Sequence, residues 1–141
     1  MALKESKYSN CLYYASNILS RKVTTMAEEA FRSLGLAPSY AYLLMTVNDQ
    51  PGIQPSAISR ELGLSPSTVT RLIEKMEYRG FLERVSEGRA TKVMPTEECK
   101  ALNPQLEKSW QNLQQRFSQE LGERYKEVLT EMSYKAAEKL E

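Results

Sequence analysis

The chain of 141 residues contains no histidine. Because histidine is a common proton acceptor near neutral pH and a frequent metal ligand, this absence argues against acid–base catalysis and against a zinc centre. The two cysteines, Cys11 and Cys99, do not form the C-x-x-C spacing of zinc sites or thioredoxin-like motifs. A glycine-rich phosphate-binding motif is also missing. We therefore expect neither an enzyme nor a bound metal or cofactor.

Long apolar runs are missing too. No stretch of about 18 apolar residues occurs, so a transmembrane helix is not predicted. The first residues, MALKESKYSNC, lack the apolar core of a secretory signal peptide. A cytoplasmic location is therefore expected, with reduced thiols rather than a disulfide. With 41% hydrophobic and 26% charged residues, the composition is that of one globular domain.

A strong charge of either sign is also absent, since the net charge is only +1. Its distribution is more informative. Residues 1–52 carry five basic and four acidic side chains, residues 53–95 carry seven and five, and residues 96–141 carry seven and nine. The middle third, at +2, is thus better suited to meet phosphate than the tail, at −2.

Apolar residues that recur every three or four positions predict several helices. The longest, residues 6–34, would span about 43 Å at roughly 1.5 Å per residue, which exceeds what a domain of this size needs. Part of its apolar stripe is therefore expected to face a partner chain, and Gly35 is placed to end the helix. Further helices are predicted at 38–49, 55–62, 66–79, from Thr96 as a cap to Gly122 as a break, and at 123–140. Pro104 is expected to bend the fifth helix or to mark a late start.

Two short segments have strand character, residues 81–85 and 90–94. The residues between them, Ser86 to Arg89, are predicted to form the turn of a β-hairpin. The expected fold class is therefore mainly α with a small hairpin wing, a winged helix-turn-helix with long N- and C-terminal helices.

The segment from Gln54 to Arg79 has the spacing of a helix-turn-helix. Ser59 is small where two helices would cross, and Gly63 can adopt a left-handed conformation between them. Val69 would pack back onto the first helix. The predicted buried stripe of the second helix is Val69, Leu72, Ile73 and Met76. The opposite face then presents hydroxyl groups and basic side chains.

That exposed face and the hairpin are expected to meet DNA. The candidate DNA-binding residues are Ser65, Ser67, Thr68, Thr70, Arg71 and Lys75 on the helix, and Arg84 and Arg89 on the hairpin. Hydroxyls at a helix N-terminus suit phosphates, and Arg71 is long enough to reach a guanine edge. Arg89, near the hairpin tip, would enter an A·T-rich minor groove. The alternative for Arg89 is a solvated turn residue.

Four stretches of the chain resemble the MarR family of bacterial repressors. They are SPSTVTRLIEKMEYRGFLER from Ser65 to Arg84, the Glu87-Gly88-Arg89 turn, Pro95-Thr96-Glu97, and Ala101-Leu102-Asn103-Pro104. The order of the expected elements is similar over nearly the whole chain. The short wing and Cys99, which stands where the family usually has glycine, depart from the pattern.

The resemblance implies a homodimeric repressor that binds a pseudo-palindromic operator. Ser67, Thr68, Thr70 and Arg71 would read the major groove and Arg89 the minor groove. Residues 6–34 and 105–140 would intertwine two subunits. One intertwined domain is expected, with an N-terminal dimerisation helix in 1–34, a DNA-binding lobe in 35–96 and C-terminal dimerisation helices in 97–141. The DNA half-sites would lie about 34 Å apart.

A repressor of this family is also expected to respond to an oxidant or a small molecule. Cys11, near the start of the first helix and followed by two tyrosines, is the candidate redox sensor, because a helix N-terminus favours a reactive thiolate. The alternative is that Cys11 is a small apolar residue in the buried stripe. The candidate pocket for an aromatic or amphipathic effector consists of Met26, Phe31, Tyr40, Tyr42 and Met45. The alternative is plain core, which such a set of aromatic residues and methionines more often forms.

Two other function classes compete with a DNA-binding regulator. A winged helix can serve as a protein–protein interaction module without DNA, but its contact face would then be apolar or acidic. The face expected here is rich in hydroxyls, with Arg71, Lys75 and Arg89. An enzyme is disfavoured by the missing histidine and nucleotide motifs.

Overall fold

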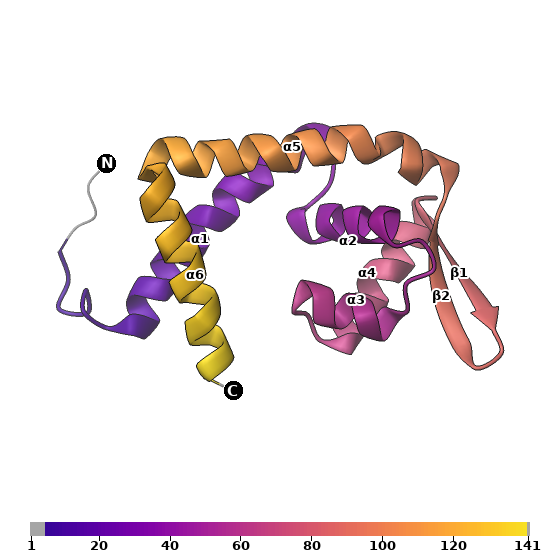
Figure 1. Ribbon diagram of the computed structural model, residues 1–141, viewed down its shortest axis with the longest axis horizontal. Helices are drawn as coiled ribbons and strands as arrows, with labels where there is room; N and C mark the ends of the chain where they lie inside the picture. The colour runs from indigo at the N-terminus through magenta and orange to yellow at the C-terminus, as the bar shows by residue number, and fades with distance from the viewer. Residues whose placement is uncertain (1–4, 141) are drawn as a thin grey trace.

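A computed structural model describes residues 5–140. Its elements, in chain order, are α1 (Leu12–Phe31), the 3-10 helix η1 (Arg32–Leu34), α2 (Pro38–Asp49), α3 (Pro55–Leu62), α4 (Pro66–Tyr78), β1 (Leu82–Glu87), β2 (Ala90–Pro95), α5 (Glu97–Leu121) and α6 (Glu123–Lys139). Figure 1 shows α5 as a bar along one side of the molecule. One end of α5 meets a winged-helix lobe made of α2, α3, α4 and the hairpin, and the other end meets α1 and α6, here called the terminal helices.

The first helix is shorter than the predicted 6–34. Residues 6–11 are not helical, and residues 32–34 tighten into η1. The cause lies in Ser6 and Ser9, because the backbone N–H and the hydroxyl of Ser9 both donate to the Ser6 carbonyl, at 3.0 and 2.6 Å. Serine side chains compete with helical hydrogen bonds in this way. The prediction that Gly35 ends the segment is confirmed, with its φ at 67°.

The winged-helix lobe follows the sequence closely. The predicted helices 38–49 and 55–62 are confirmed, and the predicted 66–79 ends one residue earlier, at Tyr78. Each of these three helices begins with proline in its first turn, where the backbone N–H that proline lacks would have no partner within the helix. α5 begins at Glu97, capped by the Thr96 hydroxyl, so Pro104 lies inside it and does not mark a late start.

The hairpin is longer than predicted and its turn is tighter. β1 and β2 pair antiparallel from Leu82↔Pro95 to Glu87↔Ala90, so the loop is only Gly88 and Arg89 rather than four residues. Glycine with positive φ at the first position of a two-residue loop is typical of a type II′ turn. An additional bridge between Ile53 and Val93 joins the hairpin to the loop before α3.

The buried core lies mainly in the winged-helix lobe and extends onto α1 and α5 through Phe31, Leu106 and Leu113. The predicted stripe of α4 is confirmed in Val69, Ile73 and Met76, which are buried, while Leu72 is partly buried. Among the described residues, α6 buries no side chain and α1 buries only Phe31. The terminal helices thus carry apolar residues that this chain leaves uncovered.

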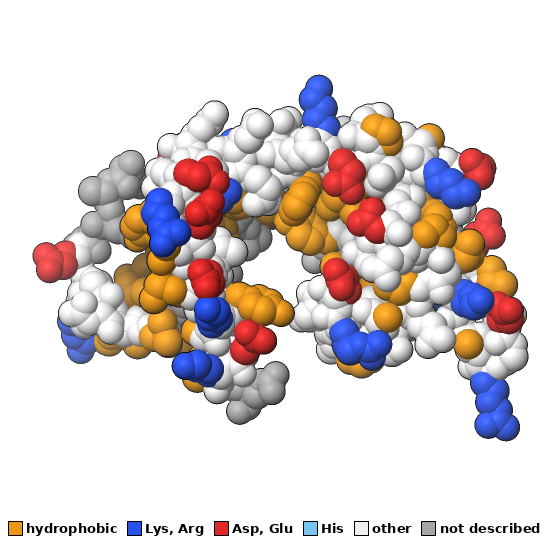
Figure 2. Space-filling view, viewed as in Figure 1, with side chains coloured by type: hydrophobic (Ala, Val, Ile, Leu, Met, Phe, Trp, Pro, Cys, Tyr) orange, Lys and Arg blue, Asp and Glu red, His pale blue; other side chains and the backbone are white. Residues whose placement is uncertain are grey.

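Most of the exposed large apolar side chains lie outside the winged-helix lobe. They are Tyr8, Leu12, Tyr13 and Leu19 near α1, and Trp110, Leu121, Tyr125, Met132, Tyr134 and Leu140 on α5 and α6 and at its end. Figure 2 shows apolar side chains gathered over the terminal helices on the face in view. Within residues 5–140, no helix is both long and apolar enough to cross a membrane.

Candidate nucleic-acid interface

The turn between α3 and α4 is built as the sequence predicts. Gly63 adopts φ 64° at the end of α3, the left-handed region that favours glycine. The Ser59 hydroxyl donates a hydrogen bond to the Leu64 carbonyl, and the Leu64 N–H donates to the Ser59 carbonyl at 3.1 Å. Val69 is buried against the core. These contacts fix the direction in which α4 leaves the turn.

Hydroxyl groups surround the N-terminus of α4. The Ser65 side chain caps the helix by accepting the Thr68 N–H at 3.2 Å, and it contacts the hydroxyls of Thr68 and Ser67 at 2.9 and 3.3 Å. Ser65 and Ser67 are exposed. The unpaired N–H groups of a helix N-terminus carry partial positive charge and bind phosphate. This end of α4 therefore offers donors to an anionic backbone.

Basic side chains continue the same face along α4. Arg71 and Lys75 are exposed, and Arg71 Nη2 lies 3.4 Å from the Thr68 hydroxyl. Within the described chain, neither side chain forms an ion pair with a carboxylate. Thr70 is exposed as well, with its hydroxyl donating to the Pro66 carbonyl at 3.0 Å. The charge of Arg71 and Lys75 is thus available to a ligand.

Of the basic side chains of the hairpin, some form ion pairs with a carboxylate and one does not. Arg89 is exposed at the tip, without an ion pair among residues 5–140, and Figure 2 shows a basic side chain extending from the lower end of the wing. Lys92 forms a 2.6 Å ion pair with Glu87, whose pKa this hydrogen bond and charge lower. Arg84 forms a 2.8 Å ion pair with Glu77. Arg84 as a DNA contact stays a prediction, and it already has a carboxylate partner.

Sequence reasoning missed the interactions of Glu77 and Arg79. Glu77 pairs with Arg84, which follows it by seven residues across a glycine turn, and a search for opposite charges flanking this turn could have found the pair. Arg79 follows α4, and its Nη1 donates to the Gly35 carbonyl at 3.1 Å. The residues are 44 positions apart, so no local pattern indicates this bond.

The candidate redox residue lies just outside the helix. Cys11 occupies the position before α1 and is exposed, so the described part of this chain does not bury it. The rings of Tyr8 and Tyr14 lie 5.9 Å apart on either side of it in sequence. Redox sensing by Cys11 remains a prediction.

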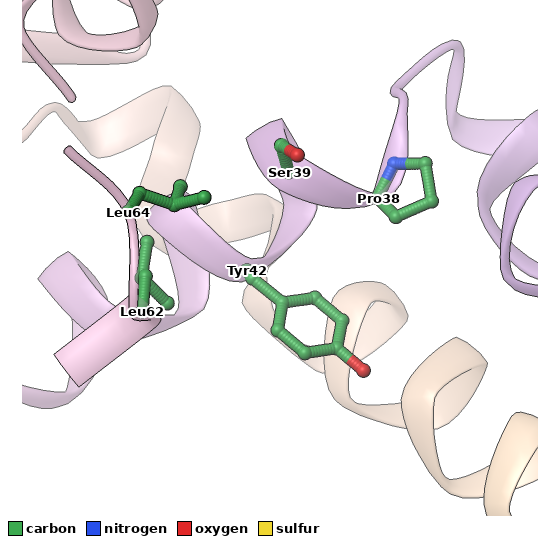
Figure 3. A pocket seen from close by; sticks show the side chains of 5 residues that line it. All are labelled: Pro38, Ser39, Tyr42, Leu62 and Leu64. Carbon is green, nitrogen blue, oxygen red and sulfur yellow. The ribbon is translucent and has the colours of Figure 1, made fainter. Parts of the chain in front are cut away.

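The five candidate pocket residues lie in different surroundings. Phe31 and Met45 are buried in the core, and Met26 and Tyr40 pack at its edge. Tyr42 does line a hollow of about 140 Å³, together with Pro38, Ser39, Leu62 and Leu64. Figure 3 shows the Tyr42 ring at the side of α2, with its hydroxyl directed away from the two leucines. Among residues 5–140, no cluster of cysteine, aspartate or glutamate could hold a metal ion.

The chain is similar to known transcriptional regulators in sequence and in fold. Residues 34–90 match the sequence model of the MarR family. The uncharacterized HTH-type transcriptional regulator YybA of Bacillus subtilis (strain 168) is 24% identical over 92 residues, which cover 63% of this chain and 61% of that relative. The chain thus matches about three fifths of the length of this relative.

Solved structures share the fold of the whole chain. The transcriptional repressor CouR, bound to a 23-mer DNA duplex, has a TM-score of 0.84 at 21% identity, with 97% of this chain and 99% of that chain covered. The PcaV transcriptional regulator of Streptomyces coelicolor, in complex with its natural ligand, has a TM-score of 0.81 at 16% identity, with 99% and 100% covered. The winged-helix segment is thus similar in sequence to the MarR family, and the whole chain shares its fold with these solved regulators.

Proposed function

We propose that this protein is a sequence-specific DNA-binding transcriptional regulator that represses its target genes as a homodimer in the cytoplasm. One observation carries the proposal. The exposed face of α4 combines a group of hydroxyls around the helix N-terminus with two basic side chains, Arg71 and Lys75, which have no carboxylate partners in the described chain. An apolar or acidic face, as a protein-binding module would need, is not what α4 presents. The repressor CouR, which shares this fold and whose solved structure holds a DNA duplex, supports the same function.

The lobe offers contacts for two grooves. An α-helix fits the major groove of B-DNA, where an arginine can bind guanine O6 and N7. α4 would lie there with Arg71 toward the bases. The hairpin would pass along the backbone and place Arg89 in the adjacent minor groove, whose negative potential in A·T-rich DNA attracts arginine.

The terminal helices support the homodimer. A chain of this size that left so many large apolar side chains in water would lose the free energy that their burial supplies, about 25 cal/mol per Å². Burial between α1 and α6 of two copies would recover it. Two copies would place their α4 helices in successive major grooves of a pseudo-palindromic site, about 34 Å apart.

A salt titration of DNA binding tests this function. The duplexes are the intergenic DNA upstream of the protein's own gene and a scrambled duplex of the same composition. We expect tight binding to the first that falls steeply with salt, and loss of the preference in Arg71→Ala. Lys75→Ala should weaken binding to both duplexes alike. Equal, weak binding of the wild type to both would contradict the proposal and favour a protein partner, which a pull-down would then identify.

We further propose that a small aromatic or amphipathic molecule releases the protein from DNA. The hollow beside Tyr42, at about 140 Å³, is similar in volume to an engineered cavity of about 150 Å³ that holds benzene. CouR bound to p-coumaroyl-CoA and PcaV bound to its natural ligand share this fold and support a ligand-responsive regulator. We expect phenolic acids to raise the melting temperature of the wild type and to do so less in Ser39→Trp, which fills the hollow. No shift at millimolar ligand would contradict the proposal.

Oxidation of Cys11 is the alternative release mechanism, and the exposed position of its thiol supports it. Peroxide should then dissociate the wild type from its operator and leave Cys11→Ser bound. Equal release of both proteins, or of neither, would contradict a sensing role for Cys11.

A further inference from the structure

The carboxylate of Glu77 joins the last turn of α4 to strand β1 through two separate bonds. Its Oε1 atom lies 2.8 Å from Nη2 of Arg84, and its Oε2 atom accepts the backbone N–H of Arg84 at 3.3 Å. The side chains of Glu77 and Arg84 are 26% and 38% exposed, so solvent reaches the pair only in part. One carboxylate thus holds both the side chain and the main chain of the same strand residue.

These two bonds lie at the base of the hairpin. Arg84 is paired across the sheet with Val93, which is buried and also bridges to Ile53. Glu87, the last paired residue before the tip, is three residues further, or about 10 Å at roughly 3.3 Å per strand residue, and Arg89 lies just beyond it in the loop. A rotation of about 10° at Arg84 would move the tip by about 2 Å. Such a movement decides whether an arginine reaches the floor of a groove.

We propose that Glu77 is a positioning residue for DNA binding, which fixes the direction of the wing relative to α4 through Arg84. Contact of Arg89 with the minor groove then depends on Glu77, although Glu77 touches no DNA itself. This inference rests on the proposed DNA-binding function. It assigns Arg84 to the support of the wing and not to a phosphate.

Arg84 could bind a phosphate or support the wing, and the two roles predict opposite effects of Glu77→Gln on the affinity for DNA. If Arg84 bound a phosphate, Glu77 would repel the same phosphate, and Glu77→Gln would leave DNA binding unchanged or tighten it. If Glu77 positions the wing, Glu77→Gln removes the ion pair and weakens binding although the protein has lost a negative charge. Glu74→Gln is the matched control, because Glu74 is an exposed carboxylate one turn earlier on α4 without an ion pair in the described chain.

The experiment measures the affinity of the purified full-length protein for its operator and for a variant operator in which the flanking A·T pairs are replaced by G·C. The guanine amino group then blocks the minor groove that Arg89 would enter. We expect the wild type to lose about tenfold in affinity on the variant operator. Arg89→Ala and Glu77→Gln should both bind the normal operator about tenfold more weakly and show no preference between the two duplexes. The double variant should bind no more weakly than Arg89→Ala alone.

Arg84→Gln is the second variant. If Arg84 supports the wing, the Arg84→Gln protein should also lose the A·T preference. The salt dependence of its binding should stay unchanged, because Glu77 already neutralises the charge of Arg84 in the wild type. A phosphate contact would instead lower the salt slope by about one unit. The preference for the operator over a scrambled duplex, which depends on Arg71, should persist in both Glu77→Gln and Arg84→Gln and shows that the lobe is folded.

The outcomes distinguish the inference from the function on which it rests. Wild-type binding with an A·T preference that Glu77→Gln retains overturns the positioning role alone. The positioning role is likewise overturned if the losses of operator affinity caused by Glu77→Gln and Arg89→Ala multiply in the double variant. Failure of the wild type to prefer its operator over a scrambled duplex overturns both the function and the positioning role.

Discussion

Arg79, the residue that follows α4, donates a 3.1 Å hydrogen bond to the carbonyl of Gly35, the residue that ends η1 after α1. The same guanidinium lies 5.5 Å from the centre of the Phe81 ring, at the entrance to β1. A single side chain therefore connects α4, the wing and the end of α1.

Replacing Arg79 with alanine should lower the free energy of unfolding. The hydrogen bond and the cation–π contact are both exposed, so we expect a loss of about 1 kcal/mol and a melting temperature lower by about 3 °C. Calorimetry or thermal circular dichroism measures the change. Arg124→Ala, which removes an arginine from an exposed pair with a 3.9 Å separation, should change the melting temperature by much less. Equal melting temperatures for both variants would contradict a role for the Arg79–Gly35 bond.

The Ser65 cap allows stability and DNA binding to be separated. Ser65→Asp keeps a side-chain oxygen that accepts the Thr68 N–H, so the protein should be as stable as the wild type. Its negative charge would stand where α4 meets phosphate, and the affinity for operator DNA should fall by about tenfold or more. Ser65→Asn, a neutral residue of the same shape, is the control and should bind DNA nearly as well as the wild type. Equal affinities for the two variants would show that this end of α4 does not approach the DNA backbone.

Cys99 makes the stability of the protein depend on alkaline pH. Burial raises the pKa of its thiol to about 11, against a smaller opposing effect of the Asn48 side chain. In the unfolded chain the thiol has a pKa of about 8.5 and ionises first. The stability is therefore fully present below about pH 8.5 and is lost as the pH rises through 11, with a slope of up to about 1.4 kcal/mol per pH unit.

The matched variant for this effect is Cys99→Ala, since tyrosines and lysines titrate in the same range in both proteins. We expect the difference in unfolding free energy between wild type and variant, followed by urea denaturation, to be constant from about pH 6 to about 8. It should then shrink toward pH 11 as the wild type loses its advantage. A difference that stays constant over this whole range would show that the Cys99 thiol ionises equally in both states.

The helix-turn-helix could be predicted from the sequence because its determinants are local. Proline at the first turn, Ser65 as a cap and Gly63 in the left-handed region each specify their own boundary, and α2, α3 and α4 agree with the predicted ranges within one residue. The extension of the first helix to residue 6 failed for the opposite reason. Its apolar spacing continued, but the serine hydrogen bonds of Ser6 and Ser9, which periodicity does not register, took the backbone groups.

The candidate site could be predicted only in part, because sequence shows which side chains are charged and not which of them are already paired. Arg71 and Arg89 look the same in sequence as Arg84, yet the fold brings Glu77 to Arg84 alone. The same limit applies to the five candidate pocket residues, which stay a prediction. An aromatic and methionine set has the same periodicity whether it lines a cavity or fills the core, and here Phe31 and Met45 fill the core.

The uncovered face of α6 gives a test of the homodimer. Tyr125 and Met132 are seven residues, or two turns, apart and lie on one face, and Met132 is 64% exposed. Met132→Glu would place a charge in an apolar subunit interface, so we expect monomers by light scattering and loss of operator binding, since one subunit reaches only one half-site. Val85→Glu introduces the same charge at an apolar residue on the wing that is 44% exposed, and it should remain dimeric. If Met132→Glu stays dimeric as well, the subunits meet through a surface other than this face of α6.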